Sequence, residues 1–377
     1  MRITDVEAIV LRPPGELNES IADGSQDALL IRIHTDAGIV GYGEVDSLPS
    51  VVKAIVDAPR SHKYASGLAS LLIGQDPLAP GPLSERLFAG SLYYGRRGAV
   101  VHAISGLEIA LWDIFGKATG QPIHALLGGA RRSSIRPYAS TLMPDTPEEV
   151  RATVEAQREA GFDAIKLGYG PLGSDPELDV SLVAAARDAA GEDCALMIDI
   201  GLGWSNAREA IDRVRRMELF RPYWIEEPFM PDEYGKYAAL AAAVDTPIAA
   251  GEQETTAQDF RRLVDVGVEV LQPDVTRVGG IAECLRVAEL ARVNGRRCVL
   301  HAWSTGIIKA ATLHVLAAMP DAELFEYCVQ TTDLNRRLVT HDFPVVSGEV
   351  AVPQGPGLGV EVDEELLEAF RVTASHV

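Results

Sequence analysis

One repeated pattern constrains the fold of this sequence more than any other feature: a short apolar run that ends on or next to a carboxylate. The pattern occurs at residues 195–199, 224–226 and 249–252, and the acidic residues at 199, 226 and 252 are 27 and then 26 positions apart. A period of about 25 to 30 residues, with each buried strand followed by a helical pattern, is typical of a parallel βα barrel. We therefore expect a barrel in this chain.

The three acidic residues of this pattern are Asp199, Glu226 and Glu252. In a barrel the carboxyl ends of successive strands surround one cavity, so these side chains are expected to converge there. Three carboxylates that meet cannot all stay ionised without a cation, and an all-oxygen site with room for water and substrate suits Mg²⁺. The sequence therefore predicts a Mg²⁺ site.

Length and composition limit the class of protein. A chain of 377 residues is longer than one ordinary domain, so we expect a barrel and a second unit. The formal net charge of -20 argues against nucleic acid and an anionic membrane as partners. Four cysteines without CxxC spacing favour buried thiols in a reducing cytoplasm. We find no signal-peptide pattern and no apolar run of membrane-spanning length.

The order of strand and helix patterns divides the chain into three parts. Residues 1–130 show strands and then helices without alternation, which indicates an α+β domain. Residues 131–334 alternate strands and helices, and residues 335–377 return to β-like sequence that we expect to rejoin the first domain. The eight expected barrel strands are at residues 135–139, 164–167, 195–199, 223–226, 247–250, 268–274, 298–301 and 323–326.

An ionisable residue stands at or near the end of seven of these expected strands. In a barrel, a polar residue at the carboxyl end of a strand is far more often a site residue than a packing residue. Seven such residues in register favour one shared active site. They are Lys166, Asp199, Glu226, Glu252, Asp274, His301 and Glu326.

Several motifs, in their order and spacing, resemble the enolase superfamily and, within it, the mandelate racemase/muconate lactonizing enzyme family with its acid-sugar dehydratases. The resemblance covers nearly the whole chain and implies an α+β capping domain over a modified (β/α)7β barrel. The motifs are GYGE at residues 41–44, SGLEIALWD at 105–113, IEEP at 225–228, GEQ at 251–253, and QPD at 272–274 leading to Gly279 and Gly280.

The resemblance implies removal of the proton α to a carboxylate, with Mg²⁺ stabilising the enediolate that forms. The three acids named above match the metal ligands of the family. His301 matches the histidine at a barrel end, and Asp274 matches the acid that pairs with it. A carboxylate on one imidazole nitrogen fixes the tautomer and raises the basicity of the other. Glu326 matches an acid that donates to the substrate carboxylate.

Two positions depart from the pattern of the family. Lys166 corresponds to the first lysine of a Lys-x-Lys pair, but the second position is Gly168. A racemase needs one base on each face of the substrate, so racemisation is disfavoured unless Lys166 itself or Tyr169 takes over. We interpret Lys166 as a cation for the substrate carboxylate. Arg277 stands where muconate-lactonizing and dipeptide-epimerising relatives have a lysine base, and arginine stays protonated.

Dehydration is compatible with both departures, because one histidine can take the α proton and then protonate the departing β-hydroxyl. We therefore expect an acid-sugar dehydratase that converts an aldonate or aldarate to a 2-keto-3-deoxy acid. The alternatives are a racemase, an epimerase or a sugar-lactone cycloisomerase, and a non-catalytic sugar-acid binding protein. The hypothesis of a hydrolytic metal-dependent barrel enzyme is weaker than these alternatives, because no His-x-His motif ends the first expected barrel strand.

Specificity is expected from the first domain and from side chains beside the dyad. The loop at residues 16–26 and the arginines Arg96 and Arg97 are candidates, the latter for a distal carboxylate held in bidentate fashion. Trp303 and Tyr169 are further substrate-binding candidates. By analogy with relatives, we expect a homo-oligomer.

Overall fold

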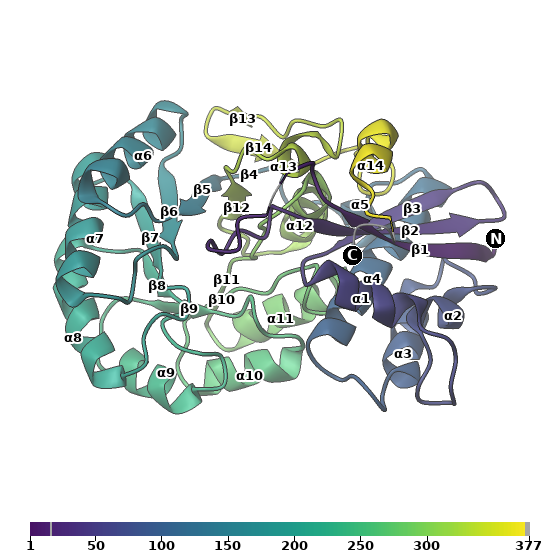
Figure 1. Ribbon diagram of the computed structural model, residues 1–377, viewed down its shortest axis with the longest axis horizontal. Helices are drawn as coiled ribbons and strands as arrows, with labels where there is room; N and C mark the ends of the chain where they lie inside the picture. Colours follow the sequence, from purple (N-terminus) through teal and green to yellow (C-terminus); the bar gives the residue numbers. More distant parts are fainter. Residues whose placement is uncertain (16, 374–377) are drawn as a thin grey trace.

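The computed structural model describes residues 1–15 and 17–373, which form an α+β domain, called the cap, beside a parallel barrel (Figure 1). The cap begins with an antiparallel sheet in the order β1-β2-β3. Its strands are β1 (Ile3–Leu11), β2 (Ala28–Thr35) and β3 (Val40–Val45). Five helices follow: α1 (Pro49–Asp57), α2 (Leu68–Leu72), α3 (Pro80–Gly90), α4 (Ala99–Thr119) and α5 (Ile123–Leu126).

Helix α4 is the core of the cap. It lies against β3 at two glycines, because a Cβ at Gly41 or Gly43 would collide with the α4 backbone. The apolar length of α4 is enough to cross a membrane, which the sequence analysis did not recognise. Of its apolar window, 83% is buried inside the protein, as expected for the core helix of a folded domain.

Eight parallel strands form the barrel sheet, in the order β11-β10-β9-β8-β7-β6-β5-β12. They are β5 (Pro137–Leu142), β6 (Ala164–Gly168), β7 (Ala195–Asp199), β8 (Trp224–Glu226), β9 (Ile248–Ala250), β10 (Val270–Leu271), β11 (Arg297–Cys298) and β12 (Phe325–Cys328). One α-helix follows each strand up to β11: α6 (Pro147–Glu159), α7 (Pro176–Ala190), α8 (Ala207–Met217) with the 3-10 turn η1 (Glu218–Phe220), α9 (Tyr234–Ala241), α10 (Ala257–Asp265), α11 (Ile281–Val293) and α12 (Gly306–Ala318). This (β/α)7β arrangement confirms the expected fold class.

The barrel closes without a continuous ladder. Across the described part of the chain, no backbone ladder joins β11 to β12. The gap is bridged by a side chain, because the backbone N–H of Ala302 donates to the carboxylate of Glu326 at 2.8 Å. The barrel floor is filled by large buried side chains, among them Tyr138 and Trp224. One end of the barrel is therefore packed, and the other is free for a site.

The main correction concerns the first expected strand, at residues 135–139. Ser134–Ile135 is instead a separate short strand, β4, and the first barrel strand β5 runs from Pro137 to Leu142. Strand β4 pairs with β14 (Glu349–Ala351), which pairs with β13 (Val345–Val346). This correction matters for function, because the carboxyl end of the strand moves from residue 139 to residue 142. The residues at that end were not among the predicted site residues.

The C-terminal segment returns to the cap after α13 (Asp333–Arg337) and ends with α14 (Glu364–Phe370). The backbone N–H of Arg12 donates to the Phe370 carbonyl at 2.8 Å, and that of Val372 donates to the Val10 carbonyl at 2.9 Å. The tail thus pairs with the carboxyl end of the edge strand β1 (Figure 1).

Two buried carboxylates of the cap hold it on the barrel at helix N-termini. Glu44 of β3 accepts hydrogen bonds from the backbone N–H of Ile308 at 2.9 Å and the Thr305 hydroxyl at 2.6 Å, where α12 begins. Glu108 of α4 accepts from the backbone N–H of Ile281 at 2.8 Å, where α11 begins. The N-terminus of a helix carries free N–H groups and a partial positive charge, so it binds a carboxylate well.

This contact explains two of the sequence motifs. Gly280 precedes α11 with a φ of 95°, and a Cβ there would collide with the carboxylate of Glu108. The SGLEIALWD motif at residues 105–113 and the glycines Gly279 and Gly280 are therefore the two sides of one interdomain contact. This contact positions the cap over the open end of the barrel.

We predict that Glu108→Gln destabilises the protein, because three N–H donors point at the two oxygens of Glu108. The expected loss of unfolding free energy is about 1 to 3 kcal/mol.

The size of this loss should depend on pH. Burial raises the pKa of Glu108 to about 7, above the ordinary 4.5. The carboxyl therefore stabilises the fold at low pH, and that contribution is lost as pH rises through 7. Thermal melting should show a larger destabilisation at pH 5 than at pH 8. An equal loss at both pH values would contradict the prediction, and the exposed Glu155→Gln of α6 is the control.

Candidate active site

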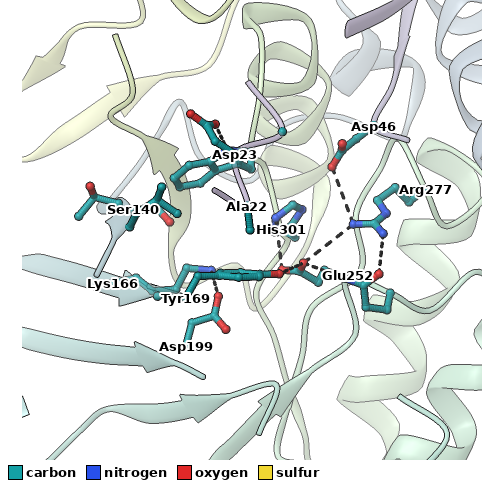
Figure 2. Close-up of a pocket in the computed structure, with 16 residues that line it drawn as sticks. Ala22, Asp23, Asp46, Ser140, Lys166, Tyr169, Asp199, Glu252, Arg277 and His301 are labelled. Atoms are coloured by element: carbon teal, nitrogen blue, oxygen red, sulfur yellow. Dashed lines mark hydrogen bonds and ion pairs between the residues drawn. The ribbon is translucent and has the colours of Figure 1, made fainter. Parts of the chain in front are cut away.

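A cavity of about 340 Å³ lies at the carboxyl ends of the barrel strands, where the cap covers them (Figure 2). This is the face at which barrel enzymes place their active sites. The residues that line it are Ala22, Asp23, Gly24, Asp46, Ser140, Thr141, Leu142, Lys166, Gly168, Tyr169, Asp199, Glu252, Gln253, Arg277, His301 and Trp303.

Three carboxylates converge at the base of this cavity, as the spacing predicted. Asp199 ends β7, Glu226 ends β8, and Glu252 follows β9 by two residues. One oxygen from each lies within 4.8 Å of the others, and all three side chains are buried. Burial and the neighbouring Glu226 raise the pKa of Asp199 well above its ordinary value. Such a crowded oxygen site fits a divalent cation, which would relieve the repulsion.

Neighbouring side chains hold Glu226 in its orientation. Its Oε2 accepts hydrogen bonds from Gln272 Nε2 at 2.7 Å and from Trp224 Nε1 at 2.8 Å. Its other oxygen, Oε1, pairs with Lys166. Such outer contacts fix the geometry of metal ligands.

Lys166 places an ammonium group among these carboxylates. Its Nζ lies 2.5 Å from Glu226 Oε1, 2.8 Å from Glu326 Oε1 and 3.9 Å from Asp199 Oδ2. Burial alone would lower the pKa of Lys166, but Glu226 and Glu326 outweigh it and hold that pKa well above the ordinary value. A charged ammonium beside these carboxylates suits the binding of a substrate carboxylate.

His301 and Asp274 form a hydrogen-bonded dyad just beyond the ends of β10 and β11. His301 Nδ1 lies 2.5 Å from Asp274 Oδ2, and Asp274 Oδ1 accepts from the backbone N–H and the hydroxyl of Thr276, both at 2.6 Å. The other ring nitrogen, His301 Nε2, lies 3.4 Å from Glu252 Oε2. The dyad therefore presents one imidazole nitrogen for proton transfer.

Glu326 is held by three donors. Its Oε1 accepts from the Ser140 hydroxyl at 2.7 Å and pairs with Lys166, and its Oε2 accepts from the Ala302 N–H. Burial would raise the pKa of Glu326, but Lys166 and His301 lower it to about 2. In this arrangement Glu326 positions Lys166 and closes the barrel. Its donation of a hydrogen bond to a substrate carboxylate stays a prediction.

The position of the missing second lysine has no room for a side chain. A Cβ at Gly168 would lie 2.7 Å from the Asp199 Cβ and 2.8 Å from its Oδ2. The next residue, Tyr169, has a φ of 60° and packs its ring over Gly201. Its hydroxyl donates to Glu252 Oε1 at 3.4 Å, so the ring lies across the cavity (Figure 2).

We predict that Gly168→Lys, which restores Lys-x-Lys, abolishes activity and does not create a racemase. The new Cβ displaces Asp199 and so weakens cation binding. Mg²⁺ calorimetry and α-proton exchange in D₂O measure the two effects, and Gly235→Lys on α9, where a Cβ contacts nothing within 4 Å, is the control. Exchange by the Gly168 variant at the wild-type rate or faster would contradict this interpretation.

Two predicted substrate contacts do not reach the cavity. Arg97 turns to α10, where its Nε lies 2.8 Å from Asp259 Oδ2 and its Nη2 donates to Gln258 at 3.1 Å. Neither Arg97 nor Arg96 is among the lining residues, so the idea that they hold a distal carboxylate is corrected. Asp259 holds Arg97 from a position 162 residues away, which the local sequence could not reveal.

The other substrate-binding candidates do line the cavity. Trp303 donates from Nε1 to Asp23 of the loop predicted at residues 16–26, at 3.3 Å. Residue 16 lies outside the described residues, and positions 22 to 24 of that loop line the cavity. Sequence analysis missed Ser140 because the end of β5 was misplaced, and missed Asp46 because it follows a cap strand rather than a barrel strand.

The fold and the site together define a class of protein: a capped barrel enzyme with a carboxylate cation site and one histidine–carboxylate dyad. Residues 7–128 match the family model of the mandelate racemase/muconate lactonizing enzyme N-terminal domain, and residues 149–366 match that of the enolase C-terminal domain-like family. The chain belongs to the mandelate racemase/muconate lactonizing enzyme family of the enolase superfamily.

Individual relatives are similar over almost their full lengths. The chain is 35% identical to the D-galactarolactone cycloisomerase of Agrobacterium fabrum, with 91% of each chain covered. It is 34% identical to the D-galactonate dehydratase of Pectobacterium atrosepticum, with 90% of each covered. The crystal structure of the 3,6-anhydro-D-galactonate cycloisomerase from Zobellia galactanivorans matches with a TM-score of 0.89 at 30% identity, over 99% of this chain and 100% of that one. These relatives are lyases and isomerases, which confirms the expected enzyme class.

Proposed function

We propose that this enzyme uses Mg²⁺ to remove the proton α to the carboxylate of an acid sugar and then eliminates water, giving a 2-keto-3-deoxy acid. The observation that carries the proposal is the single dyad of His301 and Asp274 opposite a position, Gly168, that can hold no second base. One base on one face suits elimination better than racemisation.

The roles of the residues follow from their positions. Asp199, Glu226 and Glu252 would hold the cation, which supplies positive charge to the substrate carboxylate as its second negative charge develops. Lys166 binds the same carboxylate from the side of β6. His301 takes the α proton at Nε2, while Asp274 keeps its Nδ1 protonated and stabilises the imidazolium.

The same histidine completes the elimination. The imidazolium returns its proton to the β-hydroxyl, the C–O bond breaks, and water leaves. The resulting enol tautomerises to the ketone. No second acid is required, so the absence of a lysine at residue 168 does not prevent turnover.

A sugar-lactone cycloisomerase is the second candidate, favoured by the name of one relative, the D-galactarolactone cycloisomerase. In a lactone whose ring oxygen is on the β carbon, the leaving group is a carboxylate that departs without a proton. The product then has the mass of the substrate, whereas dehydration loses water.

Proton NMR of the Mg²⁺-loaded enzyme in D₂O, with aldonates, aldarates and their lactones, tests the proposal. A new keto-deoxy product establishes elimination, and mass spectrometry separates dehydration from isomerisation. Deuterium at the α position of recovered substrate without a product would replace our proposal with an epimerase. Tight binding without turnover or exchange would point to a non-catalytic sugar-acid binding protein.

We also propose that the enzyme acts in the cytoplasm as a homo-oligomer, with neither nucleic acid nor a membrane as partner. Support for the compartment comes from the four cysteines, all buried and free. Light scattering of the purified protein measures the oligomer, and a monomeric mass would overturn that part.

A further inference from the structure

The cap side of the cavity contains an aspartate and an arginine that face each other without touching. Asp46 follows β3 of the cap, and Arg277 follows β10 of the barrel. Arg277 Nη1 lies 3.8 Å from Asp46 Oδ2, a distance at which the charges attract but no hydrogen bond forms. Figure 2 shows the two side chains directed toward each other above Glu252.

Both groups have hydrogen-bonding capacity that the protein does not use. Among the described residues, no donor bonds to the side chain of Asp46, and Arg277 Nε is buried without an acceptor. Arg277 donates from Nη2 to Gln253 at 2.7 Å, while Nη1 has only charge contacts, with Asp46 and with Glu252 at 3.9 Å. Burial raises the pKa of Asp46 to about 6, so its carboxyl is ionised at pH 7.5.

We propose that a hydroxyl of the substrate tail bridges Asp46 and Arg277, and that the pocket therefore selects sugar acids with one carboxylate over dicarboxylates. The inference rests on the proposed function and names its substrate class. A hydroxyl group can donate a hydrogen bond to Asp46 and accept one from Arg277. It would therefore use the free hydrogen-bonding capacity of both side chains and fill the gap between them.

A second carboxylate cannot complete this pair. A carboxylate accepts hydrogen bonds but donates none, so it cannot donate to Asp46. Its negative charge is also repelled by Asp46, which already neutralises the positive charge of Arg277. The nearby basic residues that would compensate, Arg96 and Arg97, do not line the cavity. The charges of the pocket thus favour an aldonate, or a lactone with one free carboxylate, over an aldarate.

The test compares D-galactonate with galactarate, which share one carbon configuration and differ in the terminal group. Equilibrium binding to the Mg²⁺-loaded protein is measured by calorimetry at pH 7.5, because binding reports the preference even where no product forms. Wild-type protein should bind galactonate about 10- to 100-fold more tightly than galactarate. Asp46→Asn should weaken galactonate binding and reduce that ratio by about tenfold or more. Asp57→Asn, an exposed carboxylate of α1, controls for the loss of one charge of the cap.

The outcomes separate this inference from the proposed function. Equal or tighter binding of galactarate by the wild type, or an unchanged ratio in the Asp46 variant, would overturn the inference. A preference for galactonate without any turnover would support the subsite and refute the dehydratase. Turnover of both acids with equal kcat/KM and equal affinity would support the dehydratase and refute the subsite.

Discussion

His301→Asn is expected to lower turnover by about 10²- to 10⁴-fold, the range that a positioned general base supplies. The amide can still bond to Asp274, but it cannot accept a proton at the position of Nε2. Because His301 is not one of the three converging carboxylates, no expected ligand is lost, and Mg²⁺ should still bind to the His301→Asn variant. Proton exchange at the α carbon in D₂O should disappear together with product formation.

Two measurements make this prediction decisive. Calorimetric titration with Mg²⁺ separates loss of chemistry from loss of the metal site. Asp274→Asn should also slow the reaction, because it removes the acceptor that holds Nδ1 protonated. Turnover of the His301 variant near the wild-type rate would remove the dyad from the mechanism and leave Lys166 and Tyr169 as the remaining candidates beside the metal site.

The barrel and the base of its site could be predicted because both depend on local sequence periods. A buried strand must alternate with a helix to build a parallel sheet, and its carboxyl end must face the common cavity. Asp199, Glu226 and Glu252 therefore came from spacing alone. The pairing of His301 with Asp274 needed the resemblance, because two neighbouring strand ends do not by themselves specify a hydrogen bond.

The remaining site residues depend on contacts between distant segments. Asp46 enters the cavity only because Glu44 and Glu108 dock the cap on two helix N-termini of the barrel, and no local pattern records that docking. Arg97 is removed from the site by a partner on α10. The function of Gly168 as a space for Asp199 likewise becomes visible only when β6 and β7 lie side by side.

Asp199→Asn tests the cation site with almost no change of shape. Asp199 Oδ1 accepts from the backbone N–H of Gly201 at 2.8 Å, and the amide oxygen of asparagine preserves that bond. The variant loses one of three ligand charges, so we expect Mg²⁺ affinity and catalysis to be lost together. The exposed Asp163→Asn, at the opposite end of β6, is the matched control and should behave as the wild type.

The melting temperature gives a second, independent test of the cation site. Without metal, the wild type must bury crowded carboxylates, and burial and then the neighbouring Glu226 raise the pKa of Asp199. Replacing Asp199 with asparagine should therefore leave the metal-free variant as stable or more stable. With Mg²⁺ at about 100 times its Kd, only the wild type should gain about 2.7 kcal/mol. A Mg²⁺-dependent rise in Tm that survives Asp199→Asn would mean that the cation binds elsewhere. A metal-free variant that melts well below the wild type would mean that Lys166 already compensates the three charges, and that the site is a stable ion-pair cluster before any metal enters.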